Sequence, residues 1–92
     1  MEKICLYSVY DLKAQKYDTP WFTASDLFAT RKFTLALEQD ATVFNRFKNE
    51  FVLRKIGDFH VLTGEFTMDI KDVIEGKQIA IGGEKNAFSN ET

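Results

Sequence analysis

The side chains in this 92-residue chain that could do chemistry are cationic and aromatic. Nine Phe, three Tyr and one Trp accompany twelve Lys and Arg residues. Cationic side chains contact phosphates and aromatic rings stack on bases of any sequence, so this combination is typical of proteins that bind single-stranded nucleic acid. The same rings can instead fill a core or an oligomer interface. The candidate binding residues are Lys13, Lys16, Tyr17, Trp21, Phe22, Arg31, Lys32, Arg46, Lys48 and Arg54.

Catalysis has little support in the sequence. The one histidine, His60, shares a predicted strand face with Asp58, but this is also an ordinary surface pair. The acidic residues lack the spacing of a calcium-binding loop, and Gly82-Gly83 lacks the Lys-Ser/Thr of a phosphate loop. A single cysteine, Cys5, provides neither a disulfide nor a thiolate metal site and fits a reducing cytoplasm. We therefore predict a non-enzyme without metal or cofactor.

The charge is unevenly distributed along the chain. Residues 1–56 carry nine Lys and Arg against seven Asp and Glu, whereas residues 57–92 carry three against seven. If the first part binds a polyanion, the acidic last third is expected to lie away from it. The alternative is a surface of ordinary mixed, solvated charge, which the net charge of −2 also allows.

A β-hairpin over residues 51–67 is the clearest structural signal. Aromatic and β-branched residues alternate on both sides of the connection Leu62-Thr63-Gly64. Gly64 is expected at positive φ, and Gly57, in mid-strand, predicts a bulge or a close approach of backbone.

Residues 4–10 are predicted to form a strand that is apolar on both faces, as central strands are. One helix can cover only one of these faces. The other face then needs a partner chain, a ligand or the C-terminal segment.

A helix is predicted from a capping box at residues 23–26 to about Gln39. At 100° per residue one of its faces suits packing on the sheet, with Ala29, Phe33, Ala36 and Leu37. Phe28 and Leu35 form a second apolar patch, which we interpret as a homodimer interface. The alternative is that a loop covers both side chains.

These elements predict an α+β domain: a small, mainly antiparallel sheet of three or four strands with one long helix packed on one face. The domain spans residues 1–81, including a loop with a short helical turn at 40–50 and an edge strand at 77–81. Residues 82–92 form a polar, flexible tail. The chain has no apolar run long enough to span a membrane and no signal peptide, so it is expected to be soluble and unprocessed.

The order of elements resembles a known family. The segments that carry the resemblance are Val-Tyr-Asp-Leu-Lys-Ala at 9–14, Pro20-Trp21-Phe22, the helix with Arg31 and Phe33, Phe44-Asn45, Phe51-Val-Leu, Ile-Gly-Asp-Phe at 56–59 and Thr-Gly-Glu-Phe at 63–66. Over roughly residues 4–68 the chain is similar to the small nonstructural protein of gokushovirus-type microviruses, which are single-stranded DNA phages.

This resemblance implies a DNA-binding protein in the host cytoplasm that acts in the switch from duplex replication to single-strand synthesis and packaging. The alternative function is an interaction protein that docks on a capsid, a scaffold or a host replication factor without binding DNA. Trp21 is central to the first interpretation. It follows the rigid Pro20 turn and is either displayed for stacking or buried in the core.

Overall fold

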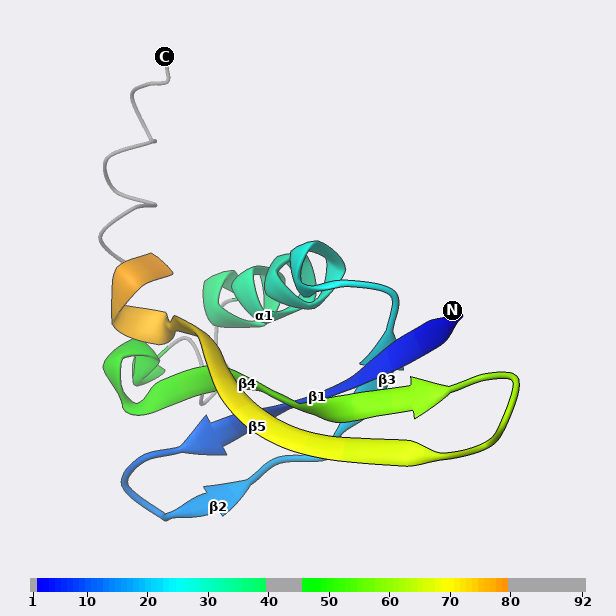
Figure 1. The fold of residues 1–92 in the computed structure, drawn as a ribbon. Helices are drawn as coiled ribbons and strands as arrows, with labels where there is room; N and C mark the ends of the chain where they lie inside the picture. The colour runs from blue at the N-terminus through cyan, green and yellow to red at the C-terminus, as the bar shows by residue number, and fades with distance from the viewer. Residues whose placement is uncertain (1, 40–45, 80–92) are drawn as a thin grey trace.

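The computed structural model describes residues 2–39 and 46–79. It is an α+β domain, as the sequence predicts, in which one helix lies over a mainly antiparallel sheet (Figure 1). The elements in chain order are β1 (Lys3–Asp11), β2 (Lys16–Tyr17), β3 (Trp21–Thr23), α1 (Asp26–Glu38), the short 3₁₀ helix η1 (Lys48–Glu50), β4 (Phe51–His60) and β5 (Phe66–Glu75).

The sheet has the order β2-β1-β4-β5, and β3 also pairs with β1. The two short strands follow one another along the same edge of β1: β2 pairs at Tyr10 and Asp11, and β3 pairs at residues 5–7. β4 occupies the other edge of β1 along its whole length. β1 is therefore the central strand, as its apolar pattern predicts.

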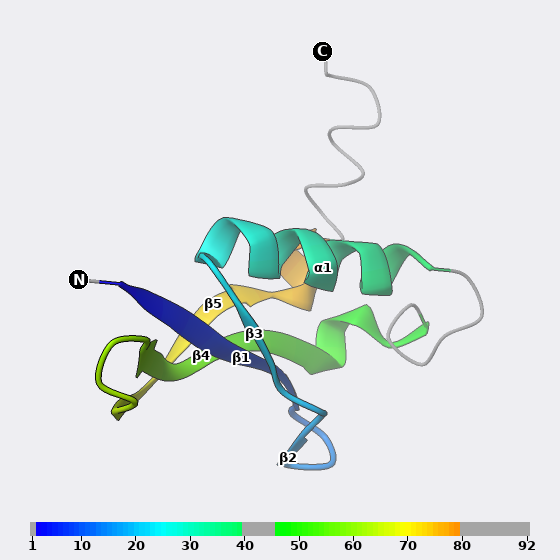
Figure 2. The same ribbon diagram turned by 90° about the vertical axis from the view of Figure 1, so that its right-hand side faces the viewer.

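The core lies between α1 and one face of the sheet (Figure 2). Ala29, Phe33 and Leu37 are buried on the inner side of the helix, as the helical periodicity predicts, and Ala36 is half-buried beside them. They pack on alternate residues of β1 and β4 because alternate side chains of a strand share one face. The sheet side of the core consists of Cys5, Tyr7, Val9, Phe51 and Leu53.

Both glycines of the hairpin behave as the sequence predicts. Gly64 lies in the turn between β4 and β5 with φ of +80°. Gly57 lies where the pairing of β4 shifts against both β1 and β5, so it marks an irregularity in the ladder. A Cβ there would contact the Thr67 carbonyl oxygen and would come within 2.7 Å of Cζ of Phe66.

The capping box prediction is wrong. The N-cap of α1 is Ser25, and no side chain caps the helix by a hydrogen bond. Asp26 does lie in the first turn, but its carboxylate accepts a hydrogen bond from the Tyr7 hydroxyl. The Asp26 carboxylate therefore binds the Tyr7 hydroxyl, and not the backbone N–H group that a capping box would give it.

The edge strand predicted at 77–81 is also wrong for the residues described. Residues 76–79 form a helical turn, in which Gln78 accepts a hydrogen bond from the Glu75 backbone and Ile79 packs against the core. Gly76 permits this turn because a Cβ would contact the carbonyl oxygen of Lys48. The predicted tail at 82–92 and Phe44 lie outside the described residues. In the part described, no helix is long and apolar enough to cross a membrane.

Beneath the start of α1, polar side chains replace apolar ones in the helix-facing layer. Oδ1 of Asp58 accepts a hydrogen bond from Sγ of Cys5 at 3.2 Å and lies 3.0 Å from Nζ of Lys55, and Oδ2 accepts from Nζ of Lys3 at 3.5 Å. Desolvation alone would raise the pKa of Asp58. The hydrogen bonds from Lys55 and Cys5 and the charges of Lys55 and Lys3 outweigh it, so that this pKa lies below its ordinary value.

The Asp58→Asn change is expected to destabilise the fold by about 1–3 kcal/mol at neutral pH, because charge-assisted hydrogen bonds are lost. A carboxyl whose pKa is lowered by folding contributes stability above its unfolded pKa, about 4, and loses that contribution as the pH falls through the folded pKa. Urea unfolding of both proteins should therefore show a difference that shrinks below about pH 4. Glu38→Gln, the same chemical change at an exposed helix position, should leave stability nearly unchanged at every pH.

Candidate nucleic-acid interface

The face of the sheet away from α1 has no helix over it in the described part of the chain (Figures 1 and 2). We call it the open face. Paired residues of neighbouring strands lie on the same side of a sheet, so the ladder registers assign its members. Apart from the buried Ser8, Val52 and Gly57, they are Ile4, Leu6 and Tyr10 of β1, Tyr17 of β2, Phe22 of β3, Arg54 and Phe59 of β4, and Phe66, Met68, Asp72 and Glu75 of β5. Ile70 has no paired residue on β4 and is placed on this face by its alternation with Met68 and Asp72.

One end of the open face, near the β4–β5 turn, carries three phenylalanines. The rings of Phe22 and Phe59 meet edge to face, with their centroids 6.1 Å apart. Phe66 pairs directly with Phe59 and reaches over Gly57, where the missing side chain leaves room for its ring. Phe22 and Phe66 remain 49% and 42% exposed, so these rings present area to solvent.

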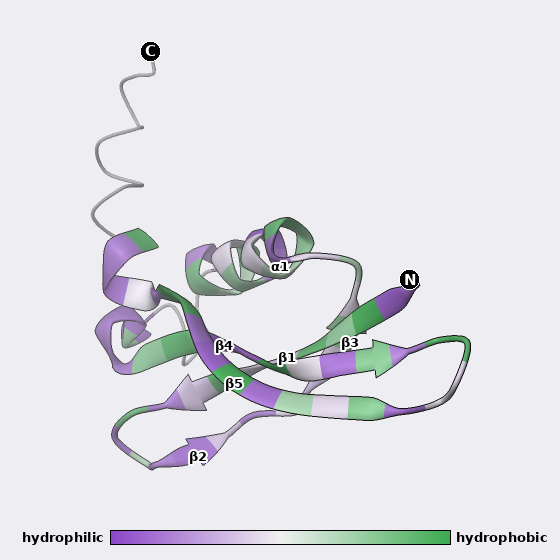
Figure 3. Ribbon diagram, in the orientation of Figure 1, coloured by the Kyte–Doolittle hydropathy of each residue, from purple (hydrophilic) through white to green (hydrophobic). Residues whose placement is uncertain are grey.

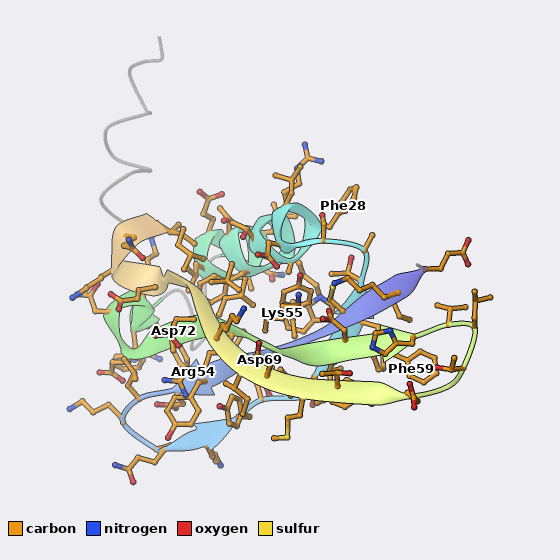
Figure 4. All side chains as sticks on the ribbon, in the orientation of Figure 1. Phe28, Arg54, Lys55, Phe59, Asp69 and Asp72 are labelled. Carbon is orange, nitrogen blue, oxygen red and sulfur yellow. The ribbon has the colours of Figure 1, made fainter. Side chains whose placement is uncertain are left out.

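The other end of the open face carries two tyrosines and an arginine. The rings of Tyr10 and Tyr17 lie 4.7 Å apart, and the Arg54 guanidinium lies 4.3 Å from the Tyr10 centroid. Arg54 also donates to the Tyr17 hydroxyl at 3.2 Å and to Asp72 at 2.7 Å (Figure 4). The hydrogen bond to Tyr17, followed by that to Asp72, raises the pKa of Arg54 against the effect of burial. The guanidinium is thus a fixed cation beside two rings.

Apolar and polar residues alternate over residues 66–71 of β5 (Figure 3). Phe66, Met68 and Ile70 lie on the open face and are 42%, 67% and 43% exposed. Asp69 and Lys71 point to the other side, where Nζ of Lys71 lies 3.3 Å from the Asp69 carboxylate. The open face therefore extends, as an apolar stripe, to the outer strand of the sheet.

Three of the candidate residues identified in the sequence come together on the open face: Tyr17, Phe22 and Arg54. Trp21 does not join them, because β3 pairs with β1 and neighbouring residues of a strand point to opposite faces. Trp21 lies on the helix side, where it is half-buried against the core. Lys32 of α1 covers its ring, with Nζ 4.7 Å from the centroid.

The remaining candidates lie around the rim or on other surfaces. Lys13 and Lys16 are exposed at the turn between β1 and β2, near the tyrosine end of the open face, but Lys16 pairs with Asp11 and therefore points to the helix side of the sheet. Arg31 is exposed on α1, across the sheet from that face. Lys48 begins η1, and Arg46 lies two residues before it, with its guanidinium carbon 5.7 Å from the centroid of the Phe47 ring. The structure therefore divides the candidates between two sides of the sheet.

Sequence reasoning did not select Tyr10, Phe59 and Phe66 for the site. Tyr10 belongs to the apolar pattern of β1, and the two phenylalanines face each other across the hairpin turn. The pairing of Phe59 with Phe66 could have been predicted from the hairpin, because strand residues at equal distances from a turn pair on one face.

The predicted dimer residues are exposed on the outer side of α1. Phe28 and Leu35 are 51% and 68% exposed, with Leu27 at 65% beside them. Phe28 points away from the sheet (Figure 4). The dimer itself stays a prediction.

Other polar groups are engaged within the fold. His60 shares a hydrogen bond of 3.1 Å with the Thr67 hydroxyl through Nε2, and Asp58 binds Lys3, Lys55 and Cys5. Across residues 2–39 and 46–79, no three His, Cys, Asp or Glu side chains are grouped closely enough to hold a metal ion.

The fold and the open face define a class: a small α+β domain with an aromatic sheet surface opposite α1. Residues 4–79 match the model of the family described as Phage ORF5 protein, and the chain belongs to that family. It is therefore a phage protein. No curated protein and no solved structure matches it significantly.

Proposed function

We propose that this chain is a non-enzymatic phage nonstructural protein that binds single-stranded DNA on its open face. Its role would be in the switch from duplex replication to single-strand synthesis and packaging in a gokushovirus-type microvirus, in the host cytoplasm. The observation that carries the proposal is the set of aromatic rings on a sheet face over which residues 2–39 and 46–79 place no helix, with Arg54 fixed among them.

The arrangement of these rings favours a single strand over a duplex. Unpaired bases expose their π faces and can stack on side chains, whereas paired bases in a duplex stack on each other. Phe22 and Phe66 offer exposed ring area at one end of the face, and Tyr17, 40% exposed, offers it at the other. A strand of DNA that runs alongside β1 from Phe22 to Tyr17 would meet a ring at each end and Arg54 near the second.

The electrostatics favour moderate affinity and one direction of approach. Asp72 compensates part of the Arg54 charge, so stacking must supply most of the binding free energy. Lys13 and Lys16 extend beyond the tyrosine end, where phosphates leaving the face would pass. The acidic residues of β5 disfavour a path along the opposite edge of the sheet.

A second function is supported by a different part of the open face. Met68 and Ile70 are exposed and apolar, and they border Asp72. Apolar area flanked by acidic groups suits a basic protein surface on a capsid, scaffold or host replication factor.

Binding to oligonucleotides distinguishes the two functions. The proposal expects fluorescence anisotropy to show binding to labelled oligothymidine that is clearly tighter than binding to a duplex of equal length. Binding should also weaken as salt rises, because phosphate contacts release counterions. Absence of binding to both at low salt would contradict the proposal and favour the protein-docking function.

Lys16→Ala is expected to reduce the slope of log K against log salt by about one phosphate contact, with only a small loss of affinity at low salt. Lys16 lies on the exposed edge strand β2 and points to the helix side, as its partner Asp11 does, so its long side chain would contact a phosphate past the edge of the sheet without ordering any ring. The matched control is Lys77→Ala, which removes an exposed lysine at the far end of the chain's described part. An unchanged slope in Lys16→Ala would remove this residue from the interface.

A further inference from the structure

The outer backbone edge of the long strand β5 is not used by the proposed function, which involves only side chains of this strand. β5 has ten residues and forms the edge of the sheet, with β4 on its only paired side in the described residues. Residues 66–72 are exposed, although the stretch is rich in apolar side chains. Proteins usually protect such an edge or pair it with another strand, because its unpaired backbone N–H and C=O groups can bind a further strand.

The charges on β5 select how a second copy would pair. When two identical antiparallel strands pair about a two-fold axis, one residue lies on the axis and faces its own copy, and its neighbours face one another in order. An axis at Asp69 or Asp72 puts two aspartates together, and an axis at Lys71 puts two lysines together. An axis at Ile70 places each Asp69 opposite the partner's Lys71.

The Ile70 axis also agrees with the side-chain directions. Asp69 and Lys71 point to the helix side, where they already contact each other at 3.3 Å, so two copies would form an alternating group of four charges. Ile70 would pack on its own copy on the open face, and Met68 would lie opposite Asp72. An axis at Met68 is the next most favourable. Its ion pair would have to use Glu65, however, and Glu65 precedes β5.

We propose that β5 pairs antiparallel with β5 of a second copy of this chain, with Ile70 on the two-fold axis. The two sheets become one continuous sheet. Because the axis is perpendicular to the sheet, both open faces lie on one side and both α1 helices lie on the other. Phe66, Met68 and Ile70, at the edge of one chain, then lie at the centre of a shared face. The pairing can be tested without DNA, so the result of that test is independent of the proposed function.

A cysteine at the axis tests the register directly. Ile70→Cys should cross-link to its own copy under mild oxidation, because directly opposed strand residues have Cα atoms about 4.5–5.5 Å apart, within disulfide range. Met68→Cys is the matched control on the same face. In this register it lies about 13 Å along the strand from its own copy and should not cross-link. The wild-type protein controls for Cys5, which is buried.

Charge reversal tests the ion pairs in solution. Asp69→Lys and Lys71→Asp should each raise the dimer dissociation constant, measured by sedimentation velocity on the full chain, by about tenfold or more, since both cross-strand pairs become repulsive. The double reversal should restore the dimer. Glu38→Lys, which makes the same charge change as Asp69→Lys on the helix, should not alter it.

Three results would overturn the proposal. The first is a wild-type chain that stays monomeric at tens of micromolar. The second is cross-linking of Met68→Cys in place of Ile70→Cys. The third is a dimer lost in the Phe28→Ser/Leu35→Ser variant but retained in Asp69→Lys, which would assign the interface to α1. Near-native circular dichroism is required of each variant, and Lys71→Asp provides a second test if Asp69→Lys does not fold.

Discussion

Replacing Tyr17 and Phe22 together by Ser is expected to weaken binding to single-stranded DNA by roughly 2–6 kcal/mol, at least about 30-fold, because stacking on one ring contributes about 1–3 kcal/mol. These two rings lie at opposite ends of the open face and are both more than a third exposed. They belong to short strands on the edge of β1 that is remote from β5. The change should therefore leave any β5 pairing intact.

The matched control is Phe28→Ser/Leu35→Ser, which also removes two exposed apolar side chains but from the opposite side of the molecule. It should bind oligothymidine like the parent protein. Anisotropy titrations should be read together with circular dichroism and thermal melting, so that unfolding is separated from lost contact. A folded Tyr17→Ser/Phe22→Ser protein with parental affinity would rule out stacking on the open face.

Gly57→Ala is expected to destabilise the fold by about 3 kcal/mol or more, since its Cβ would meet backbone atoms in addition to the Phe66 ring, and backbone cannot move aside as a side chain can. The contacts are the Thr67 carbonyl oxygen and, at 3.0 Å, the Met68 Cα. To relieve them, β5 must move away from β4. That movement would break the ladder that holds Phe66 and Met68 on the open face.

Gly64→Ala makes the same chemical change in the same hairpin and is the control. Nothing lies within 4 Å of its Cβ, so the cost is only that of an L residue at φ of +80°, about 1–2 kcal/mol. Urea unfolding followed by circular dichroism measures both losses. Equal losses for the two variants would show that the sheet adapts at Gly57 at little cost.

Several features were predictable because they depend on local pattern. The apolar residues on both faces of β1 made it the central strand, and the helical periodicity of Phe33 and Leu37 identified the buried side of α1. The hairpin turn required a glycine at positive φ, and Gly64 supplies it. Local geometry sufficed in these cases because the spacing of side chains is fixed within each element.

Other features depended on how separate elements meet. The pairing of β3 with β1 put Trp21 under α1 and Phe22 on the open face, a division that their adjacent positions do not reveal without the register. The turn at residues 76–79 depended on the approach of Gly76 to the Lys48 carbonyl, which propensity alone did not predict.

The shifted pairing near Gly57 had the largest effect on the candidate site. Between Lys55 and Gly57 the chain changes its register against both neighbours, so Lys55 faces the helix with Asp58 although Gly57, two residues later, lies on the open face. Simple alternation counted along β4 would have placed these residues on one side. The sequence by itself determined the central strand β1, the β4–β5 hairpin and the helix α1. Only the tertiary structure decided which aromatic and charged side chains share a face, because a single irregular pair reverses the direction of every side chain beyond it.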